Sequence, residues 1–259
     1  MSDSVDTVQR RIKDYIPHAD LLANKTVLVT GASRGIGRAI SLAAAAVGAQ
    51  TILLARNAEQ LDRLASEIID NDGIEPCIVP ADLEGAGIED YATIASLLNE
   101  RFGGLDGLVL NAGMLGEMAP LMSYDPLTWA RVFQVNVHSQ FLLLQSILPL
   151  MAQREEASII FTSSGVARQA RAYWGAYAVS KFATEGMMQT LADELAQEDR
   201  IRVNGLNPGR LRTKMRAEAY PAEDPMTLKE PAEIMNAYLF LLSQDSRGAH
   251  GLSLNAQGV

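Results

Sequence analysis

Short β-rich runs alternate with longer helical patterns from Lys25 onward, and this alternation constrains the fold more than any other feature. Strands that alternate with helices imply right-handed crossovers and a parallel sheet covered by helices on both faces. The continuous apolar runs at 27–29 and 52–54 suit strands buried on both sides. The predicted strands are 26–30, 51–55, 75–80, 107–110, 158–162, 202–206 and 252–254, and the predicted helices are 37–47, 58–71, 88–101, 126–153, 176–197 and 231–243.

No linker or low-complexity tract divides residues 25–259, so we expect a single α/β domain with a doubly wound parallel sheet of about seven strands. Residues 1–24 are predicted to be an N-terminal extension with one helix near 7–15, ended by Pro17. The function of this extension does not follow from its pattern.

Composition and charge exclude several classes of function. A formal net charge of −9 disfavours nucleic acid as a partner, because the phosphate backbone attracts basic surfaces. One cysteine, Cys77, provides no disulfide framework, and His18, His138 and His250 are too scattered to indicate a metal site. We found no signal peptide and no run long enough for a membrane span, so the expected location is cytoplasmic.

A glycine-rich turn follows the first predicted strand and opens a helix. Its spacing is G-x-x-x-G-x-G, with glycines at 31, 35 and 37. Such glycines let the backbone turn tightly and approach a pyrophosphate, which then lies at the helix N-terminus. This strand–turn–helix context predicts a dinucleotide-binding, Rossmann-type domain, although a turn without a ligand is the alternative. The predicted contacts are Gly31, Ser33, Arg34, Gly35, Ile36 and Gly37.

The end of the second strand indicates which dinucleotide binds. An acidic residue there would hydrogen-bond the ribose 2′-hydroxyl of NAD and repel a 2′-phosphate. This chain has Arg56 instead, and Arg34 can reach the same region. Guanidinium groups bind phosphate oxygens in a fork, so the pair favours NADP (NADPH), unless both are ordinary surface arginines.

Tyr177 and Lys181 lie four residues apart at the start of a helical pattern, so their side chains share one helix face. A tyrosine with an ordinary pKa near ~10 exchanges protons slowly at neutral pH, whereas a nearby cation stabilises the phenolate. The spacing therefore predicts a tyrosine whose pKa is lowered by Lys181 and which acts as an acid or base. Two ordinary helix residues are the alternative.

Several motifs together resemble the short-chain dehydrogenase/reductase family over roughly residues 22–256. They are the glycine turn, Asn111 with Gly113, Asn136, Ser164, Tyr177 with Lys181, and Pro208 with Gly209, all in the family's order and spacing. The sequence around 162–168 and 174–188 further resembles the YciK-like branch of bacterial members.

The resemblance implies further cofactor contacts. Asp82 and Leu83 match positions that meet the adenine ring, although Asp82 could instead cap a helix. Asn111, Ala112 and Gly113 match the segment beside the adenosine ribose, with a structural turn as the alternative for Asn111. Pro208, Gly209 and Thr213 match contacts to the nicotinamide, and Tyr177 and Lys181 also face the cofactor.

The resemblance also implies four catalytic residues. Ser164, with Ser163 as its rival, would hydrogen-bond the substrate oxygen, and Tyr177 would exchange a proton with that oxygen. Lys181 would lower the pKa of Tyr177 and bind the nicotinamide ribose. Asn136 would hold a water for proton relay, or would simply form an interhelical hydrogen bond.

Residues on three segments are expected to bound the substrate site. Met114, Leu115, Trp174, Met215 and Tyr220 could form an apolar wall, and Arg168 and Arg171 could bind an anionic group. The loop 210–229 could act as a lid. The helices 126–153 and 176–197 are apolar over more than one face, and the corresponding helices of the family form dimers, so a homodimer or homotetramer is expected.

The sequence thus predicts an NADP(H)-dependent oxidoreductase that converts a ketone or aldehyde to an alcohol, or the reverse, without a metal. A non-catalytic NADP-binding regulator and an NAD-dependent alcohol dehydrogenase are the alternatives. Epimerisation or dehydration of nucleotide sugars is disfavoured, because relatives with those activities carry a longer substrate domain.

Overall fold

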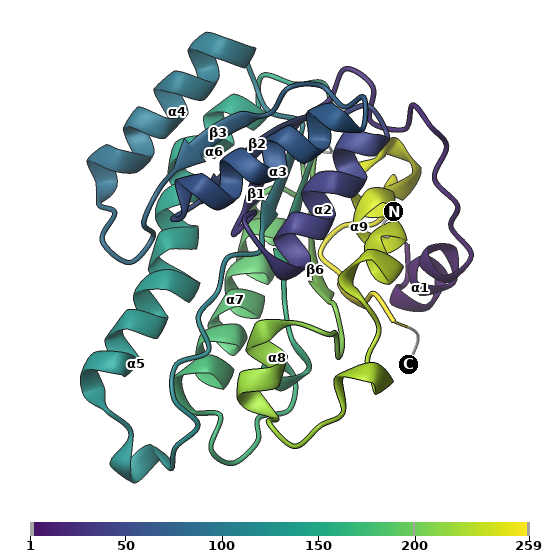
Figure 1. The fold of residues 1–259 in the computed structure, drawn as a ribbon. Coiled ribbons are helices and arrows are strands. Elements are labelled where there is room, and N and C mark those ends of the chain that lie inside the picture. The colour runs from purple at the N-terminus through teal and green to yellow at the C-terminus, as the bar shows by residue number, and fades with distance from the viewer. Residues whose placement is uncertain (1–2, 199, 258–259) are drawn as a thin grey trace.

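The computed structural model describes residues 3–198 and 200–257, and the few remaining positions of the predicted extension and domain lie outside the described residues. A parallel sheet lies between two layers of helices (Figure 1). Its strands are β1 (Thr26–Thr30), β2 (Gln50–Ala55), β3 (Cys77–Pro80), β4 (Gly107–Leu110), β5 (Ala157–Thr162), β6 (Ile201–Asn207) and β7 (Ser253–Asn255). All seven predicted strands are confirmed to within two residues at either end.

The strand order is β3-β2-β1-β4-β5-β6-β7, and every neighbouring pair is parallel. The chain moves outward from β1 to β3, returns to pair β4 with β1, and then continues to the other edge. The order therefore reverses between β1 and β4. In open α/β sheets, ligands bind at the carboxyl ends of the strands beside such a point.

The helices are α1 (Val5–Lys13), α2 (Gly35–Ala46), α3 (Ala58–Asp70), α4 (Ile88–Phe102), α5 (Pro126–Phe133), α6 (Ser139–Met151), α7 (Gly175–Glu194), α8 (Lys214–Ala219) and α9 (Met235–Leu242). One apolar cluster joins the sheet to α2, α3 and α9, and another joins it to α4, α6 and α7. Successive residues of β1 belong to alternate clusters, with Val27 and Val29 in the first and Leu28 in the second. This alternation explains the continuous apolar runs, since both faces of the sheet are buried.

The N-terminal extension contains the predicted helix, α1, which lies beside α9 (Figure 1). Val8 and Ile12 of α1 are buried in the same cluster as α2 and α9. The side chain of Gln9 donates to the carbonyl of Asn255 and accepts from its N–H, at 2.5 and 3.0 Å. The helix therefore satisfies backbone groups on the open edge of β7, which would otherwise face solvent. The boundary at residue 24 stays a prediction.

The predicted helix 231–243 begins with a 3-10 turn, η5 (Pro231–Ile234), so α9 starts four residues later than predicted. Two further predicted elements differ from the structure. The predicted helix 126–153 is interrupted by a π-helical turn, η2 (Gln134–His138), between α5 and α6. The predicted loop 210–229 contains α8, whose N-cap Thr213 accepts from the N–H of Arg216 at 3.2 Å. Both differences lie at the edge of the candidate site.

Candidate active site

The glycine turn and the segment after β4 meet where the strand order reverses. Gly31 has φ +67°, and a Cβ placed on it would lie 3.0 Å from the Cα of Ala112. A Cβ on Gly37 would lie 2.2 Å from the carbonyl oxygen of Gly31. The sequence therefore needs glycine at both positions, since any larger residue would push β1, the turn and α2 apart.

The N-terminus of α2 opens directly from this turn. Its N-cap is Arg34, and no side chain among the described residues caps the first-turn N–H groups. Unpaired N–H groups and the helix dipole favour an anion at this point. Gly35 has φ +56°, so the backbone turns into the helix without a side chain in the way. This arrangement fits a pyrophosphate, as the spacing predicted.

The predicted NADP-selecting arginines lie at the ends of neighbouring strands. Arg34 follows β1 within the turn, and Arg56 follows β2 immediately. The Nη1 of Arg56 lies 3.9 Å from a carboxylate oxygen of Asp82, which follows β3, and both side chains are mostly exposed. An exposed pair at this distance contributes little, so a phosphate can compete for the guanidinium. Two positive groups at this edge fit a 2′-phosphate.

Asp82 is not a helix cap, because the N-cap of α4 is Gly87. Instead, the Asp82 carboxylate accepts from the N–H of Glu84 at 3.2 Å and shapes the turn after β3. Leu83 is buried beside it in the cluster of α4. These residues lie at the carboxyl end of β3, on the same edge of the sheet as Arg56.

The side chain of Asn111 helps to join the ends of β1 and β4. Its side-chain amide donates to the carbonyl of Thr30 at 3.0 Å. The hydroxyl of Thr30 accepts from the N–H groups of Asn111 and Ala112, at 2.9 and 3.0 Å. The ends of β1 and β4 are thereby locked together, and the backbone of 111–113 is held along the edge where a cofactor would lie.

The loop after β6 reaches the glycine turn from the other side. The Cγ2 of Thr213 would lie 3.7 Å from a Cβ placed on Gly35. Gly209 has φ +76°, and Gln257 donates to the carbonyl of Pro208 at 2.9 Å. Thr213 thus lies beside the glycine turn, and the nicotinamide contacts of Pro208, Gly209 and Thr213 stay a prediction.

Tyr177 and Ser164 meet at the carboxyl end of β5. The Ser164 side chain lies beside the Tyr177 hydroxyl, and Tyr177 is 8% exposed. The hydroxyl of the rival Ser163 donates instead to Glu185. The structure therefore brings Ser164, rather than Ser163, to the tyrosine.

The prediction that Lys181 lowers the pKa of Tyr177 is wrong. Burial raises the pKa of Tyr177, and the hydrogen bond with Ser164 opposes this only in part. Lys181 is 3% exposed, and burial lowers the pKa of its ammonium to about 8 against the opposing charge of Glu185. The ammonium donates to the carbonyl of Thr162 at 2.7 Å and lies 5.8 Å from the centroid of the Tyr177 ring. Tyr177 is therefore protonated at neutral pH, which is the form that a proton donor needs.

Asn136 lies in the π-helical turn and is fully buried. Its amide donates to the carbonyl of Met114 at 3.0 Å and to the hydroxyl of Ser180 at 2.9 Å, and it accepts from the N–H of Met114 at 2.7 Å. The predicted interhelical bond is thus present, joining the turn to α7. Wider π turns interrupt helices at functional sites, and this one aims Asn136 at the segment after β4.

Apolar side chains surround Tyr177. Leu115, Val166 and Ala178 are buried with it, and Trp174, Met215 and Ala219 pack against them. The Trp174 ring lies 5.7 Å from that of Tyr177 and 5.8 Å from that of Tyr220. Most of the predicted wall is therefore assembled, although Met114 belongs to a neighbouring cluster.

The predicted anion-binding role of Arg168 does not fit its contacts. The guanidinium of Arg168 is bonded to the side chains of Ser253 and Asn255 and to the carbonyl of Leu254. Arg168 therefore ties the turn after Ser164 to β7. Arg216 of α8 makes a two-pronged ion pair with Glu223.

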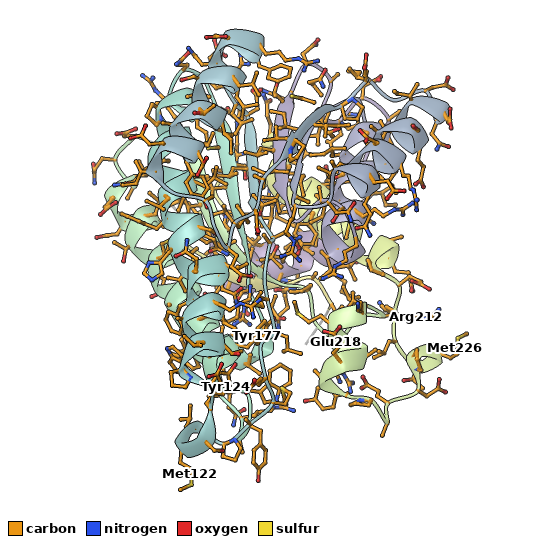
Figure 2. The ribbon with its side chains drawn as sticks, turned by 60° about the vertical axis from the view of Figure 1, so that its left-hand side comes forward. Met122, Tyr124, Tyr177, Arg212, Glu218 and Met226 are labelled. Carbon is orange, nitrogen blue, oxygen red and sulfur yellow. The ribbon has the colours of Figure 1, made fainter. Side chains whose placement is uncertain are left out.

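The segment 210–229 lies across from Tyr177. In Figure 2, Arg212, Glu218 and Met226 lie on one side, whereas Tyr177, Tyr124 and Met122 lie on the other. The guanidinium of Arg216 stacks on the Tyr220 ring at 3.7 Å, and this ring touches Trp174. Aromatic contacts therefore join the predicted lid to the wall beside Tyr177.

Sequence reasoning missed the role of Tyr124. This buried ring lies so close to Gly116 and Gly175 that a Cβ on either would approach it to 2.4 Å. Its hydroxyl accepts from the N–H of Glu117 at 3.0 Å. Tyr124 thus positions the start of α7, which carries Tyr177. The only signal in the sequence was the pair of distant glycines, and neither has a recognisable spacing from Tyr124.

Within residues 3–198 and 200–257, no group of three or more His, Cys, Asp or Glu side chains is placed to hold a metal ion. Over the same residues, no helix is long and apolar enough to cross a membrane.

Comparison with known proteins agrees with this geometry. A family model described as short chain dehydrogenase matches residues 25–224. The Escherichia coli K12 protein named "Uncharacterized oxidoreductase YciK" is 49% identical over 243 residues, which cover 94% of this chain and 96% of the relative.

Two similar solved structures contain a nicotinamide cofactor. A short chain dehydrogenase from Shigella flexneri in complex with NADP is 48% identical, with a TM-score of 0.90 and coverage of 93% of this chain and 100% of the other. One from Escherichia coli CFT073 in complex with NADPH is 49% identical, with a TM-score of 0.91 and the same coverage.

Proposed function

The chain belongs to the short-chain dehydrogenase family, and on that premise we propose that it is an NADP(H)-dependent oxidoreductase that interconverts a carbonyl compound and an alcohol. One observation carries the proposal: Ser164, Tyr177 and Lys181 gather at the carboxyl end of β5, on the edge of the sheet that holds the glycine turn. The bound NADP and NADPH of the two similar structures support the choice of cofactor.

Ser164, Tyr177 and Lys181 would each have a separate role in the reaction. Bound NADPH would supply the hydride that adds to the carbonyl carbon. The hydroxyls of Ser164 and Tyr177 would hydrogen-bond the substrate oxygen, and Tyr177 would transfer its proton to that oxygen. The Lys181 ammonium, oriented by the Thr162 carbonyl, would stabilise the phenolate that this transfer leaves. In the reverse direction, the phenolate would accept the proton of the alcohol.

The surroundings of Tyr177 favour an uncharged, largely apolar substrate. Leu115, Val166 and Trp174 pack around the phenol, while Arg168 and Arg216 are engaged with other protein groups. A negatively charged substrate would lose its hydration here without gaining a partner from Arg168 or Arg216.

The direct test is a panel of ketones, aldehydes and quinones, each neutral compound matched with a carboxylated analogue, with NADPH absorbance as the readout. We expect turnover of at least one neutral compound and weaker turnover of its carboxylated analogue. NADPH binding without turnover across the panel would instead favour a regulatory protein. A cytoplasmic location stays a prediction from the sequence.

The proposed cofactor preference predicts the behaviour of Arg56→Asp. A carboxylate at the end of β2 would repel a 2′-phosphate and accept a bond from a 2′-hydroxyl. Losing one charge-assisted contact costs about 1.5–3 kcal/mol, so we expect NADPH affinity to fall by at least about tenfold while NADH affinity holds or rises. Fluorescence titration with both cofactors measures this.

Arg10→Asp is a matched control for that variant, because Arg10 is an exposed arginine on α1 whose guanidinium donates to the carbonyl of Asp6. The control should leave the ratio of the two affinities unchanged. If Arg56→Asp weakens NADPH and NADH equally, Arg56 does not select the cofactor.

We also propose that the chain forms a homodimer or homotetramer through the outer side of the α4, α6 and α7 layer. Leu97, Phe141, Val179 and Phe182 are large apolar side chains that remain 42–47% exposed there. Exposed apolar residues on neighbouring helices are typical of subunit interfaces. Phe182→Asp is expected to shift the sedimentation coefficient toward the monomer, whereas Ile69→Asp on α3 should not. A wild-type monomer at micromolar concentration would contradict the proposal.

A further inference from the structure

Glu185 is a buried carboxylate that the proposed reaction does not use. It lies on α7, one turn beyond Lys181, and is 6% exposed. The backbone of β6 passes directly beside it, since a Cβ on Gly205 would lie 3.3 Å from one of its oxygens. A carboxylate in such a place must be compensated by hydrogen bonds and by opposite charge.

Hydrogen bonds to Glu185 come from two strands. The hydroxyl of Ser163, at the end of β5, donates to it, and the hydroxyl of Ser253 on β7 donates to the same oxygen at 3.0 Å. Ser163 immediately precedes Ser164. The carboxylate therefore fixes the backbone that carries the substrate-binding hydroxyl to the helix that carries Tyr177.

The charged groups around Glu185 are few in the described part of the chain. Lys181 is one turn away on α7, and its pKa is held up by the charge of Glu185 against the effect of burial. Arg168, from the turn after β5, reaches Ser253 at 2.8 Å.

Three other titratable groups lie on the surrounding elements. Tyr177 shares the helix face of Lys181 and Glu185, and Tyr238 of α9 lies 3.2 Å from the Thr162 hydroxyl. His250 is bonded to the Ala192 carbonyl, two turns beyond Glu185. Among these groups, Glu185 is the carboxylate that faces Lys181.

We propose that Glu185 is a positioning residue for the reaction, whose buried charge keeps Lys181 an ammonium at neutral pH and whose bond to Ser163 holds Ser164 in place. The inference rests on the proposed function and deepens it, because it assigns a source for the charge on Lys181. Sequence reasoning did not single out Glu185, because this residue lies outside the tyrosine–lysine spacing.

Glu185→Gln tests the charge while preserving the shape and an oxygen that can accept from Ser163. Removing an opposite charge near Lys181 disfavours the ammonium, so the alkaline limb of kcat/KM should move down by about one pH unit. A purely structural role would lower kcat at every pH and leave the limb in place. Glu185→Asp should restore most of the wild-type profile, and the exposed Glu194→Gln on the same helix should not change it.

Ser163→Ala separates the two roles. It removes the hydroxyl but keeps the carboxylate charge, so kcat should fall while the alkaline limb stays near its wild-type position. A limb that moves as far in Ser163→Ala as in Glu185→Gln would overturn the assignment of the shift to charge.

The titration of Lys181 can also be followed without a substrate. The chain has five lysines, so ¹³Cε-lysine NMR gives few signals, and Lys181→Met assigns the relevant one. We expect a wild-type midpoint near pH 8, as burial predicts, and a midpoint about one unit lower in Glu185→Gln.

The two readouts separate the two proposals. An unchanged NMR midpoint in Glu185→Gln would overturn the role of Glu185, whatever the turnover. A lowered midpoint would support that role even if no carbonyl compound were turned over, an outcome that would count against the proposed reaction alone. If Glu185→Gln does not fold, Glu185→Met gives the same test, because it also removes the charge and fills the space, with the same downward shift expected and no shift overturning the inference.

Discussion

Replacing Tyr177 by Phe is expected to lower kcat for carbonyl reduction by about 10³-fold, because it removes the proton donor without disturbing the site. The Phe ring keeps the contacts of Tyr177 with Leu115, Val166 and Trp174. Ser164 loses one partner, so the substrate oxygen retains a single donor. NADPH affinity should change by only a few fold, because the glycine turn and the arginines are untouched.

Steady-state oxidation of NADPH and fluorescence titration of the same preparation separate these effects. Tyr15→Phe is the matched control, since it also removes a phenolic hydroxyl but lies on the far side of α9, bonded to Asp245. It should retain wild-type turnover. If Tyr177→Phe keeps more than about a tenth of the wild-type kcat, another group donates the proton and the proposed mechanism is wrong.

The sheet and most of the site could be predicted because their signals are local. Val27, Leu28 and Val29 form a continuous apolar run, which only a strand buried on both faces requires, and β1 lies as predicted. The glycine turn is also a local signal, because a side chain on Gly31 would clash with Ala112 and a side chain on Gly37 would clash with the carbonyl of Gly31. Parallel topology then brings these carboxyl ends together without further information.

The break in the predicted helix 126–153 could not be predicted, because a distant contact causes it. Asn136 makes its hydrogen bonds to Met114, earlier in the chain, and to Ser180, later in the chain. Periodicity over the segment itself remains helical throughout. The helix α8 was missed for a different reason, since six residues without a buried side chain leave no periodic pattern.

The protonation state of Tyr177 also could not be predicted from the sequence. Spacing of four residues places Tyr177 and Lys181 on one face, and that much is correct. The direction of the ammonium depends on the Thr162 carbonyl, and its charge depends on burial and on Glu185. Burial outweighs the effect of Ser164, so the pKa of Tyr177 rises, and it outweighs the charge of Glu185, so the pKa of Lys181 falls.

Burial of the Lys181 ammonium lowers the free energy of unfolding of the chain. In the unfolded chain its pKa is near 10.5, and in the folded chain it is about 8. Below pH 8 the group is charged in both states, so the full cost is present. Between the two values the folded form loses its proton first, and the cost declines as the pH rises. At about 1.36 kcal/mol per pH unit, the cost at neutral pH is roughly 3 kcal/mol.

Lys181→Met is therefore expected to be catalytically inactive and yet more stable than the wild type at pH 7. The variant avoids the buried charge but loses the bond to the Thr162 carbonyl, worth about 1 kcal/mol, so the net gain should be roughly 2 kcal/mol. The gain should shrink steadily above pH 8 and vanish before the unfolded pKa of 10.5 is reached, because the lost bond remains while the cost of the buried charge disappears. Urea unfolding at several pH values measures it, with the exposed Lys214→Met as the control. A difference in stability that does not depend on pH would show that Lys181 is not a buried cation in the folded chain. The proposed role of the Lys181 ammonium in stabilising the Tyr177 phenolate would then be wrong.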